Sequence, residues 1–225
     1  MCFSAPASFS AAAVCAGIGV LTVRRAGKVD LMLAFIPIIF SLQQALEGFV
    51  WLTKAAGCGR DAGYGFAIIA FCLWPLYVPV ATWRSETNAR LRTFMLSFAV
   101  PGTVVAATAA WVLFVGLKID FATNKIQYLP TTRYPLIFDY LYAICVIVPF
   151  LLHRNIYLRI FGCLILVFFG LSTLLFNPAR YSVWCFFAAI SSIVLYFFVA
   201  SRNGPARGRS APAPGEAHEI EPQKV

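Results

Sequence analysis

The sequence predicts an all-α protein, a bundle of seven transmembrane helices whose N-terminus lies outside the cell and whose C-terminus lies inside. Of its 225 residues, 60% are hydrophobic and only 12% are charged. Soluble domains are about half apolar and about a quarter charged. Apolar runs of roughly 20 residues recur along the chain, and each is long enough to cross a bilayer as a helix. Helices are expected because lipid offers the backbone no hydrogen-bond partners.

Seven apolar runs fill residues 1–200, which we interpret as one membrane domain. The first run is rich in Ala, Gly and Ser, and no Lys or Arg precedes it, so it lacks the pattern of a secretory signal. Ser4 is suited to cap this helix, and Pro6 is tolerated in a first turn. The predicted helices are Ala5–Val23, Leu31–Thr53, Tyr64–Trp83, Thr93–Leu117, Pro135–Leu152, Leu158–Phe176 and Tyr181–Ala200.

The positive charges orient this bundle, because Lys and Arg in short loops favour the cytoplasm. With the N-terminus outside, 12 of the 18 Lys and Arg residues fall in cytoplasmic segments. The net charge of +9 therefore indicates membrane topology and attraction to anionic lipid headgroups. No basic face interleaved with aromatic residues suggests nucleic-acid binding. Residues 201–225, rich in Pro, Gly, Ala and charge, are predicted to form a disordered cytoplasmic tail.

One connection is longer than the others, the polar segment Lys118–Tyr134, which could fold over the outer mouth of the bundle. It divides the helices into three, one and three. The outer triplets share similar basic turns, "VLTVRRAGKVDLML" and "PFLLHRNIYLRIFG", so a parallel repeat as in SWEET-type sugar-efflux transporters is one interpretation. Any two neighbouring helices need such a turn, so the repeat stays an open alternative.

The stretch "SLQQALEGFVW" places polar residues inside the second apolar run. Gln43, Gln44, Glu47 and Trp51 recur at helical spacing and share one face. An ionisable residue in hydrocarbon costs several kcal/mol unless it faces protein or water, so this face is predicted to point inward. Glu47 is about six residues from the outer end of its helix, which places it roughly 9 Å below that boundary.

A second acid is expected near the same depth. Asp139 lies about four residues past Pro135, hence roughly 6 Å from the outer boundary, with Tyr142 one turn below it. Trp74 opens the stretch "WPLYVP" of the third helix, whose two prolines bend the helix. The bend either opens a pocket or is a packed kink. We expect a polar cavity in the outer half of the bundle, lined by Gln43, Gln44, Glu47, Trp51, Trp74, Asp139 and Tyr142.

Two interpretations of this polar face remain open. The amides and the acid of the second helix can hydrogen-bond neighbouring helices, a contact worth about 0.6 to 2 kcal/mol, and Asp139 can cap its own helix. Alternatively the face is functional, as intramembrane acids usually are. Two amides would orient a polar solute, and Glu47 would carry a proton or bind a cation.

Three motifs resemble a family of bacterial membrane proteins of unknown function. They are "MCFSAPASF" at the start, "QQALEGFVW" on the second helix and "WPLYVP" on the third. The family pattern is MCFSA-x-ASF, QQ-x-x-EG-x-x-W and WP-x-x-x-P. The resemblance implies a multi-pass protein of the bacterial cytoplasmic membrane and draws attention to Cys2, but it implies no activity.

The seven cysteines form no CxxC pair, so no metal-ligand spacing is present. Cys2 and Cys58 are both predicted outside, where they could form a disulfide. If Met1 is removed, Cys2 becomes N-terminal, and its α-amine could activate its own thiol as a catalytic nucleophile. The two hypotheses exclude each other in the resting protein.

Several cofactor proteins are excluded by residue type. A retinal Schiff base needs a lysine within a helix, whereas all five lysines lie in predicted loops or the tail. His153 is the one histidine near a helix, too few for bis-histidine haem or a His-rich zinc site. We therefore expect no cofactor and no metal. The favoured function is binding or transport of a small polar solute or ion. The alternatives are an intramembrane enzyme using Cys2 and a structural or sensory subunit; the oligomeric state is open.

Overall fold

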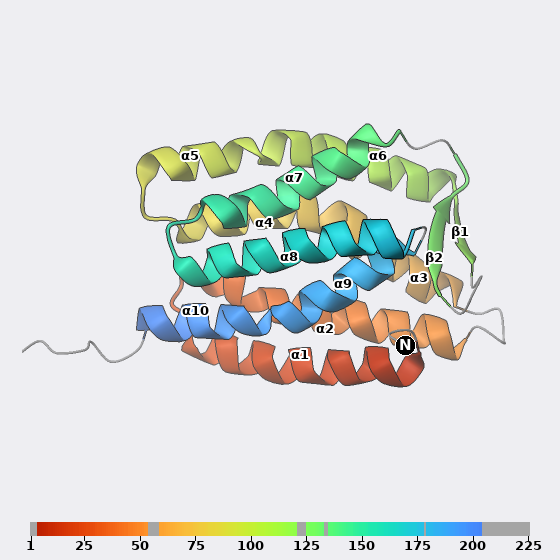
Figure 1. Ribbon diagram of the computed structural model, residues 1–225, viewed down its shortest axis with the longest axis horizontal. Coiled ribbons are helices and arrows are strands. Elements are labelled where there is room, and N and C mark those ends of the chain that lie inside the picture. The colour runs from red at the N-terminus through yellow and green to blue at the C-terminus, as the bar shows by residue number, and fades with distance from the viewer. Residues whose placement is uncertain (1–3, 54–58, 121–124, 133–134, 178, 204–225) are drawn as a thin grey trace, which may run out of the picture.

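A computed structural model describes residues 4–53, 59–120, 125–132, 135–177 and 179–203. Long helices run roughly along one direction in this bundle, and a short β-hairpin crosses one end of it (Figure 1). The elements in order are α1 Ala5–Arg25, α2 Leu31–Leu52, α3 Arg60–Ala67, the π-helix η1 Ile68–Leu73, α4 Trp74–Ser85, α5 Ala89–Ser97, α6 Ala99–Val115, β1 Leu117–Asp120, β2 Gln127–Pro130, α7 Ile137–Leu152, α8 Ile156–Leu175, α9 Arg180–Ser191 and α10 Ile193–Asn203.

Successive elements join into the expected membrane-crossing segments. Within the described residues, six continuous helical segments are long and apolar enough to cross a bilayer, and the seventh helix, Ile137–Leu152, is shorter. Large apolar side chains such as Phe114, Leu174 and Val100 are exposed on the surface, as lipid-facing residues are. The length and composition of these helices therefore indicate a helical, multi-pass membrane protein. Its orientation across the membrane stays a prediction. Residues 201–203 of the predicted tail belong to helix α10, and the rest of the tail, from residue 204, lies outside the described residues and stays a prediction.

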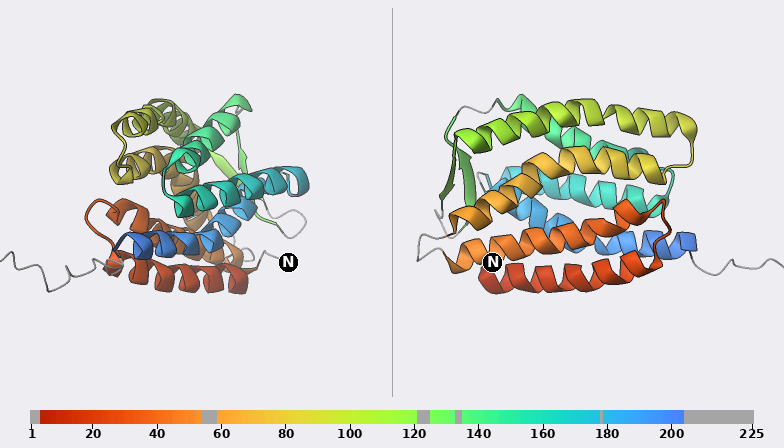
Figure 2. Two further views of the ribbon diagram at one scale, coloured as in Figure 1. Left: turned by 60° about the vertical axis from the view of Figure 1, so that its left-hand side comes forward. Right: turned by 180° about the vertical axis from the view of Figure 1, so that it is seen from behind.

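The two ends of the bundle differ. We call the end that carries β1 and β2 the hairpin end, and the end where α10 stops the tail end. The N-terminus of α1 and the first residues of α9 lie at the hairpin end. In contrast, α5 begins at the tail end and continues into α6 toward the hairpin end (Figures 1 and 2). The predicted orientation places the hairpin end outside and the tail end in the cytoplasm.

The small residues of the first helix serve close packing. Ser4 accepts a hydrogen bond from the Ala7 amide, and a proline occupies the first turn, which confirms the predicted start of α1. The buried side chains of α1 are all short: Ser8, Ala11, Ala12, Cys15, Gly19 and Thr22. A β-carbon on Gly19 would lie 2.4 Å from Ile38 of α2. Ser41 also donates to the carbonyl of Ala12 at 2.8 Å. Short side chains thus let the two backbones approach, as in many membrane helix pairs.

The prolines of the third segment are accommodated by a π-helix and by a neighbouring glycine. In π geometry the carbonyl of Ala70 faces residue 75, and Pro75 has no N–H to donate. Tyr142 of α7 donates its hydroxyl to this carbonyl at 2.6 Å. The Pro75 carbonyl lacks a backbone donor in turn, because residue 79 is also proline, and a β-carbon on Gly102 of α6 would lie 2.1 Å from it. The predicted bend is therefore a packed one.

The long connection folds into a hairpin that the sequence analysis missed. β1 and β2 pair antiparallel, with Ile119 opposite Tyr128. Ile126 and Tyr128 are buried against Phe66 and Val50, and the rings of Tyr128 and Phe66 stack with centroids 4.6 Å apart. The expected covering of the bundle mouth thus comes from an ordered two-stranded element in the described part of this connection.

Candidate functional site

The polar face of α2 is buried inside the protein, as predicted. Gln43, Gln44 and Glu47 expose 2% of their surface or less. Ser182, in the first turn of α9, donates its hydroxyl to Glu47 Oε1. The indole N–H of Trp74 donates to Gln43 Oε1 at 2.9 Å. The face therefore holds together helices that are far apart in sequence.

Several polar atoms of this face have no partner. Among the described residues, the amide nitrogen of Gln43 and both amide atoms of Gln44 make no hydrogen bond, although they are fully enclosed. Buried polar groups in native proteins are almost always bonded to protein or to ordered water. Two donors and one acceptor beside a buried carboxylate are therefore free to bind water, an ion or a solute.

The hairpin adds a residue that the sequence analysis did not select. Tyr128 of β2 is 6% exposed, and its hydroxyl also lacks a partner within the described residues. Burial raises the pKa of Tyr128 well above its usual value, and the charges of Glu47 and Cys185 raise it further, so the phenol keeps its proton. The alternation of Ile126 and Tyr128 in "KIQYLP" was the available signal, because inward-facing strand residues recur every second position.

The other predicted acid has its own partners. The first two residues of α9, Arg180 and Tyr181, both donate hydrogen bonds to the carboxylate of Asp139, and Arg180 forms an ion pair with it. Sequence analysis did not select Arg180 or Tyr181 as partners of Asp139. Ser182 follows directly and bonds Glu47. The first turn of α9 thus connects both acids, one through Tyr181 and the other through Ser182.

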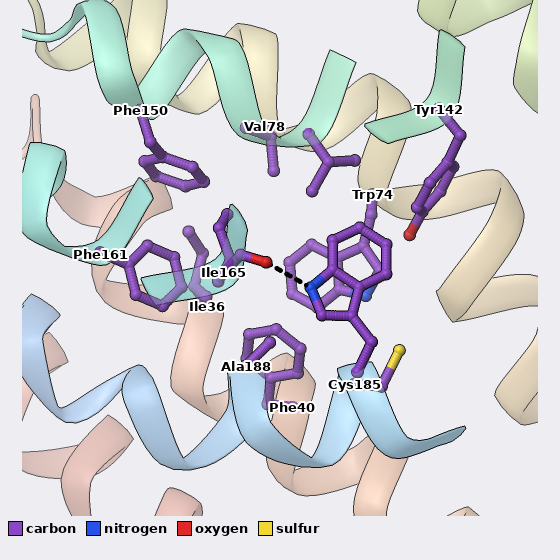
Figure 3. A pocket seen from close by; sticks show the side chains of 12 residues that line it. Ile36, Phe40, Trp74, Val78, Tyr142, Phe150, Phe161, Ile165, Cys185 and Ala188 are labelled. Carbon is purple, nitrogen blue, oxygen red and sulfur yellow. Dashed lines mark hydrogen bonds between the residues drawn. The ribbon is translucent and has the colours of Figure 1, made fainter. Parts of the chain in front are cut away.

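An apolar cavity lies beside this polar face. Figure 3 shows Trp74, Tyr142 and Cys185 on one side of the space and Phe150 and Phe161 on the other. The cavity is about 30 Å³ in volume, enough for about two water molecules. A second space of about 50 Å³ lies beneath the hairpin, between Tyr128 and Tyr181. In place of the expected polar cavity, the structure has a packed polar cluster, and the small spaces next to it are mainly apolar.

The remaining predicted residues have separate positions. Trp51 packs at the edge of the apolar cluster beneath the hairpin, next to Val50. Cys2 lies outside the described residues, as does Cys58, so the disulfide and the nucleophile both stay predictions. Ser172, at the hairpin end of α8, is buried with an unpartnered hydroxyl in the described structure. We call Gln43, Gln44, Glu47, Trp74, Tyr128 and Ser182 the Glu47 cluster.

A second buried polar group lies at the tail end, where the sequence analysis saw only a solitary histidine. Glu86, just after α4, accepts backbone hydrogen bonds from Thr87, Asn88 and Arg154 at 2.7 to 2.9 Å. His153 Nδ1 lies 3.7 Å from Glu86 Oε2. His153 is 3% exposed, so it is a buried partner of Glu86.

The titration of His153 gives folding a pH dependence. Burial lowers the pKa of His153 to about 4, and the opposing effect of Glu86 does not compensate. Between about pH 6.5 and pH 4 the unfolded chain therefore binds a proton that the folded chain does not. We expect the melting temperature in detergent to fall across this window as the pH is lowered, and to fall less in His153→Gln.

Replacement of the other histidine, His218→Gln, should leave this pH dependence unchanged. Burial would raise the pKa of Glu86, but its three backbone donors and His153 lower it overall, so its contribution is lost only at the acid end of the window or below. If the melting temperatures of the wild type and of His153→Gln were equally independent of pH between pH 7 and pH 4, the buried, neutral state of His153 would be contradicted.

A match to one protein family decides the membership of the chain. DUF6629, a family of unknown function, matches residues 1–210. The chain belongs to this family. The match covers every described helix and both strands. No curated protein and no solved structure matches the chain. Membership in DUF6629 therefore supports the resemblance found in the sequence, while function must be argued from the geometry of the Glu47 cluster.

Proposed function

We propose that this DUF6629 protein binds a small polar solute or ion at the Glu47 cluster and moves it across the bacterial cytoplasmic membrane. The observation that carries the proposal is the set of unpartnered atoms of Gln43, Gln44 and Tyr128 around a buried carboxylate. The amide nitrogens and the Tyr128 hydroxyl suit a solute with carbonyl oxygens, whereas the Gln44 carbonyl oxygen and the Glu47 carboxylate suit a cation or a protonated species.

The competing explanation is that these polar residues serve only to join neighbouring helices, and it fits the unpartnered atoms poorly. Polar residues that join membrane helices do so by hydrogen-bonding across the interface. Gln43 Oε1 and Glu47 Oε1 fulfil that role, through Trp74 and Ser182. Gln44 does not join another helix: its amide makes no hydrogen bond of normal geometry within the described residues, and the polar group it influences is Glu47 of the same helix. A fully buried glutamine that joins no other described helix favours a site that exchanges water or ligand.

The small volumes beside the site limit what it holds in this conformation. Spaces of about 30 and 50 Å³ hold only a few waters or a bare ion. We interpret the structure as a closed state. A larger solute requires the bundle to open, which the hairpin over the site and the helix ends around it would control.

Native mass spectrometry of the purified protein in mild detergent tests the proposal. We expect the wild type to retain a non-covalent small molecule or ion, and Glu47→Gln to lose it, because the substitution keeps the shape but removes the charge. Asp61→Asn is the matched control, since Asp61 is an exposed acid in the first turn of α3 at the same end. It should retain the bound species.

The same spectra discriminate the alternatives. Loss of Met1 together with a covalent adduct on Cys2 would replace the proposal with the intramembrane enzyme. A bare chain in the wild type, with Glu47→Gln unchanged in stability, would support a structural subunit. A species retained equally by wild type and Glu47→Gln would remove Glu47 from the site.

A further inference from the structure

The last membrane-crossing segment, α9 with α10, carries an arginine at each end. Arg180 begins α9 at the hairpin end and pairs with Asp139 of α7. Arg202, near the end of α10 at the tail end, places its Nε 3.2 Å from Asp30 Oδ2, at the start of α2. Both aspartates are buried, with exposures of 7% and 3%. One segment is therefore clamped by an ion pair at both mouths of the bundle.

Each ion pair is supported by a further hydroxyl group at the same end of the bundle. At the tail end, Ser85 donates to Asp30 Oδ1 at 2.8 Å, and Arg202 donates to the Ser85 carbonyl at 2.9 Å. Asp30 stands at the N-terminus of α2 but does not cap it, because its carboxylate binds Ser85 and Arg202 instead. At the hairpin end, the hydroxyl of Tyr181 donates to Asp139, while Ser182 of the same turn bonds Glu47. At each end an aspartate thus binds an arginine and a hydroxyl group.

The helical segment is interrupted at a single residue, Ser192, between its two ion pairs. α9 ends at Ser191, α10 begins at Ile193, and the two are inclined to each other (Figure 1). Ser192 donates its hydroxyl to the carbonyl of Ala189 at 2.6 Å, and the thiol of Cys15 contacts the same carbonyl at 3.4 Å. Serine pairs that divert backbone hydrogen bonds are a usual cause of helix kinks. Either half can therefore tilt while the other stays clamped.

The break lies beside the central cavity. Cys185 and Ala188 of α9 line this central cavity, the apolar space of Figure 3, together with Trp74 of the Glu47 cluster. Breaking one ion pair leaves one buried aspartate without its arginine, whereas breaking both would leave two.

We propose that α9 and α10 form the moving element of the transport pathway, with Arg180–Asp139 as the gate at the hairpin end and Arg202–Asp30 as the gate at the tail end. This inference rests on the proposed transport function. The kink at Ser191–Ser192 lets the gates open in turn, so the central cavity and the Glu47 cluster face one side of the membrane at a time.

The gates can be tested without any solute by labelling Cys185 from each side of the membrane. The parent protein keeps Cys185 as its one cysteine, with alanine at the other six positions. It is reconstituted in vesicles in both orientations, so that an external probe reaches either the hairpin end or the tail end. The probe is a membrane-impermeant methanethiosulfonate. Asp139→Asn should speed labelling about tenfold from the hairpin side, and Asp30→Asn about tenfold from the tail side, which corresponds to about 1.4 kcal/mol each.

The control parent keeps Cys15 instead, which is buried beside the kink but does not line the cavity. It should stay unlabelled in both variants. Arg180→Gln and Arg202→Gln repeat the test if an aspartate variant fails to fold, and Arg→Lys at either position should restore slow labelling. Labelling of Cys15, or equal labelling of Cys185 from both sides in each variant, would overturn the gates.

The outcome separates the two proposals. Sided labelling of Cys185 without a bound solute in the native mass spectra would keep the gates and reject the solute assignment. A bound solute that depends on Glu47, with Cys185 unreactive in every variant, would keep the site and reject α9 with α10 as the moving element.

Discussion

Gly102→Ala should lower the melting temperature strongly, although it adds one methyl group to a helix. The added β-carbon would lie 2.1 Å from the carbonyl oxygen of Pro75 and 3.0 Å from its carbonyl carbon. Both are backbone atoms, so no side chain can rotate away, and α6 must separate from α4. Overpacking of a tight interface costs about 1 to 3 kcal/mol, and a backbone collision belongs at the upper end.

Gly17→Ala and Gly170→Ala are the matched controls for this prediction. A β-carbon at either position meets nothing within 4 Å. Alanine favours a helix over glycine by about 1 kcal/mol, so these variants should melt at the same or a higher temperature. Thermal melts followed by circular dichroism in one detergent compare all three. A Gly102→Ala protein as stable as the controls would show that α4 and α6 do not pack at this carbonyl.

Arg180→Met should destabilise the protein by about 3 kcal/mol, because it leaves a buried carboxylate without its cation. Asp139 is 7% exposed and, among the described side chains, would keep the hydroxyl of Tyr181 as its donor. Asp139→Asn should cost less, since the arginine side chain left behind is 19% exposed and can reach water. The melting temperatures of the two variants should therefore differ in this order.

The double variant Asp139→Asn with Arg180→Met completes a mutant cycle for this pair. Once the carboxylate is gone, loss of the guanidinium leaves no buried charge, so the double variant should be more stable than Arg180→Met alone. Additive losses would mean that the ion pair contributes nothing and would also weaken its role as a gate.

The sequence predicted the parts of this protein that follow from local patterns. Apolar runs located all seven helical segments, and the spacing of Gln43, Gln44 and Glu47 located the buried face of α2. Burial follows from the cost of a charge in lipid, which one helix alone reveals. The resemblance carried by three short motifs agreed with membership in DUF6629, which covers residues 1–210.

The partners of these residues could not be predicted, because they depend on how distant helices pack. Nothing in one helix shows that Ser182 meets Glu47, or that Arg180 meets Asp139. The hairpin was missed because its strands have only four residues each and are stabilised by packing on α3. The π-helix was missed because its register is set by Pro75 together with a hydroxyl from Tyr142 on another helix.

The bond between Ser182 and Glu47 has a consequence for how the protein is made. The two residues are 135 positions apart, whereas Trp74 reaches Gln43 after only 31. At about 5 to 20 residues per second, a ribosome needs roughly 7 to 27 seconds to deliver Ser182 after Glu47. Throughout that interval the acid sits in a nascent chain without its final partner. During biogenesis, the Glu47 carboxylate must therefore contact the insertion machinery, stay hydrated or be protonated until α9 is inserted.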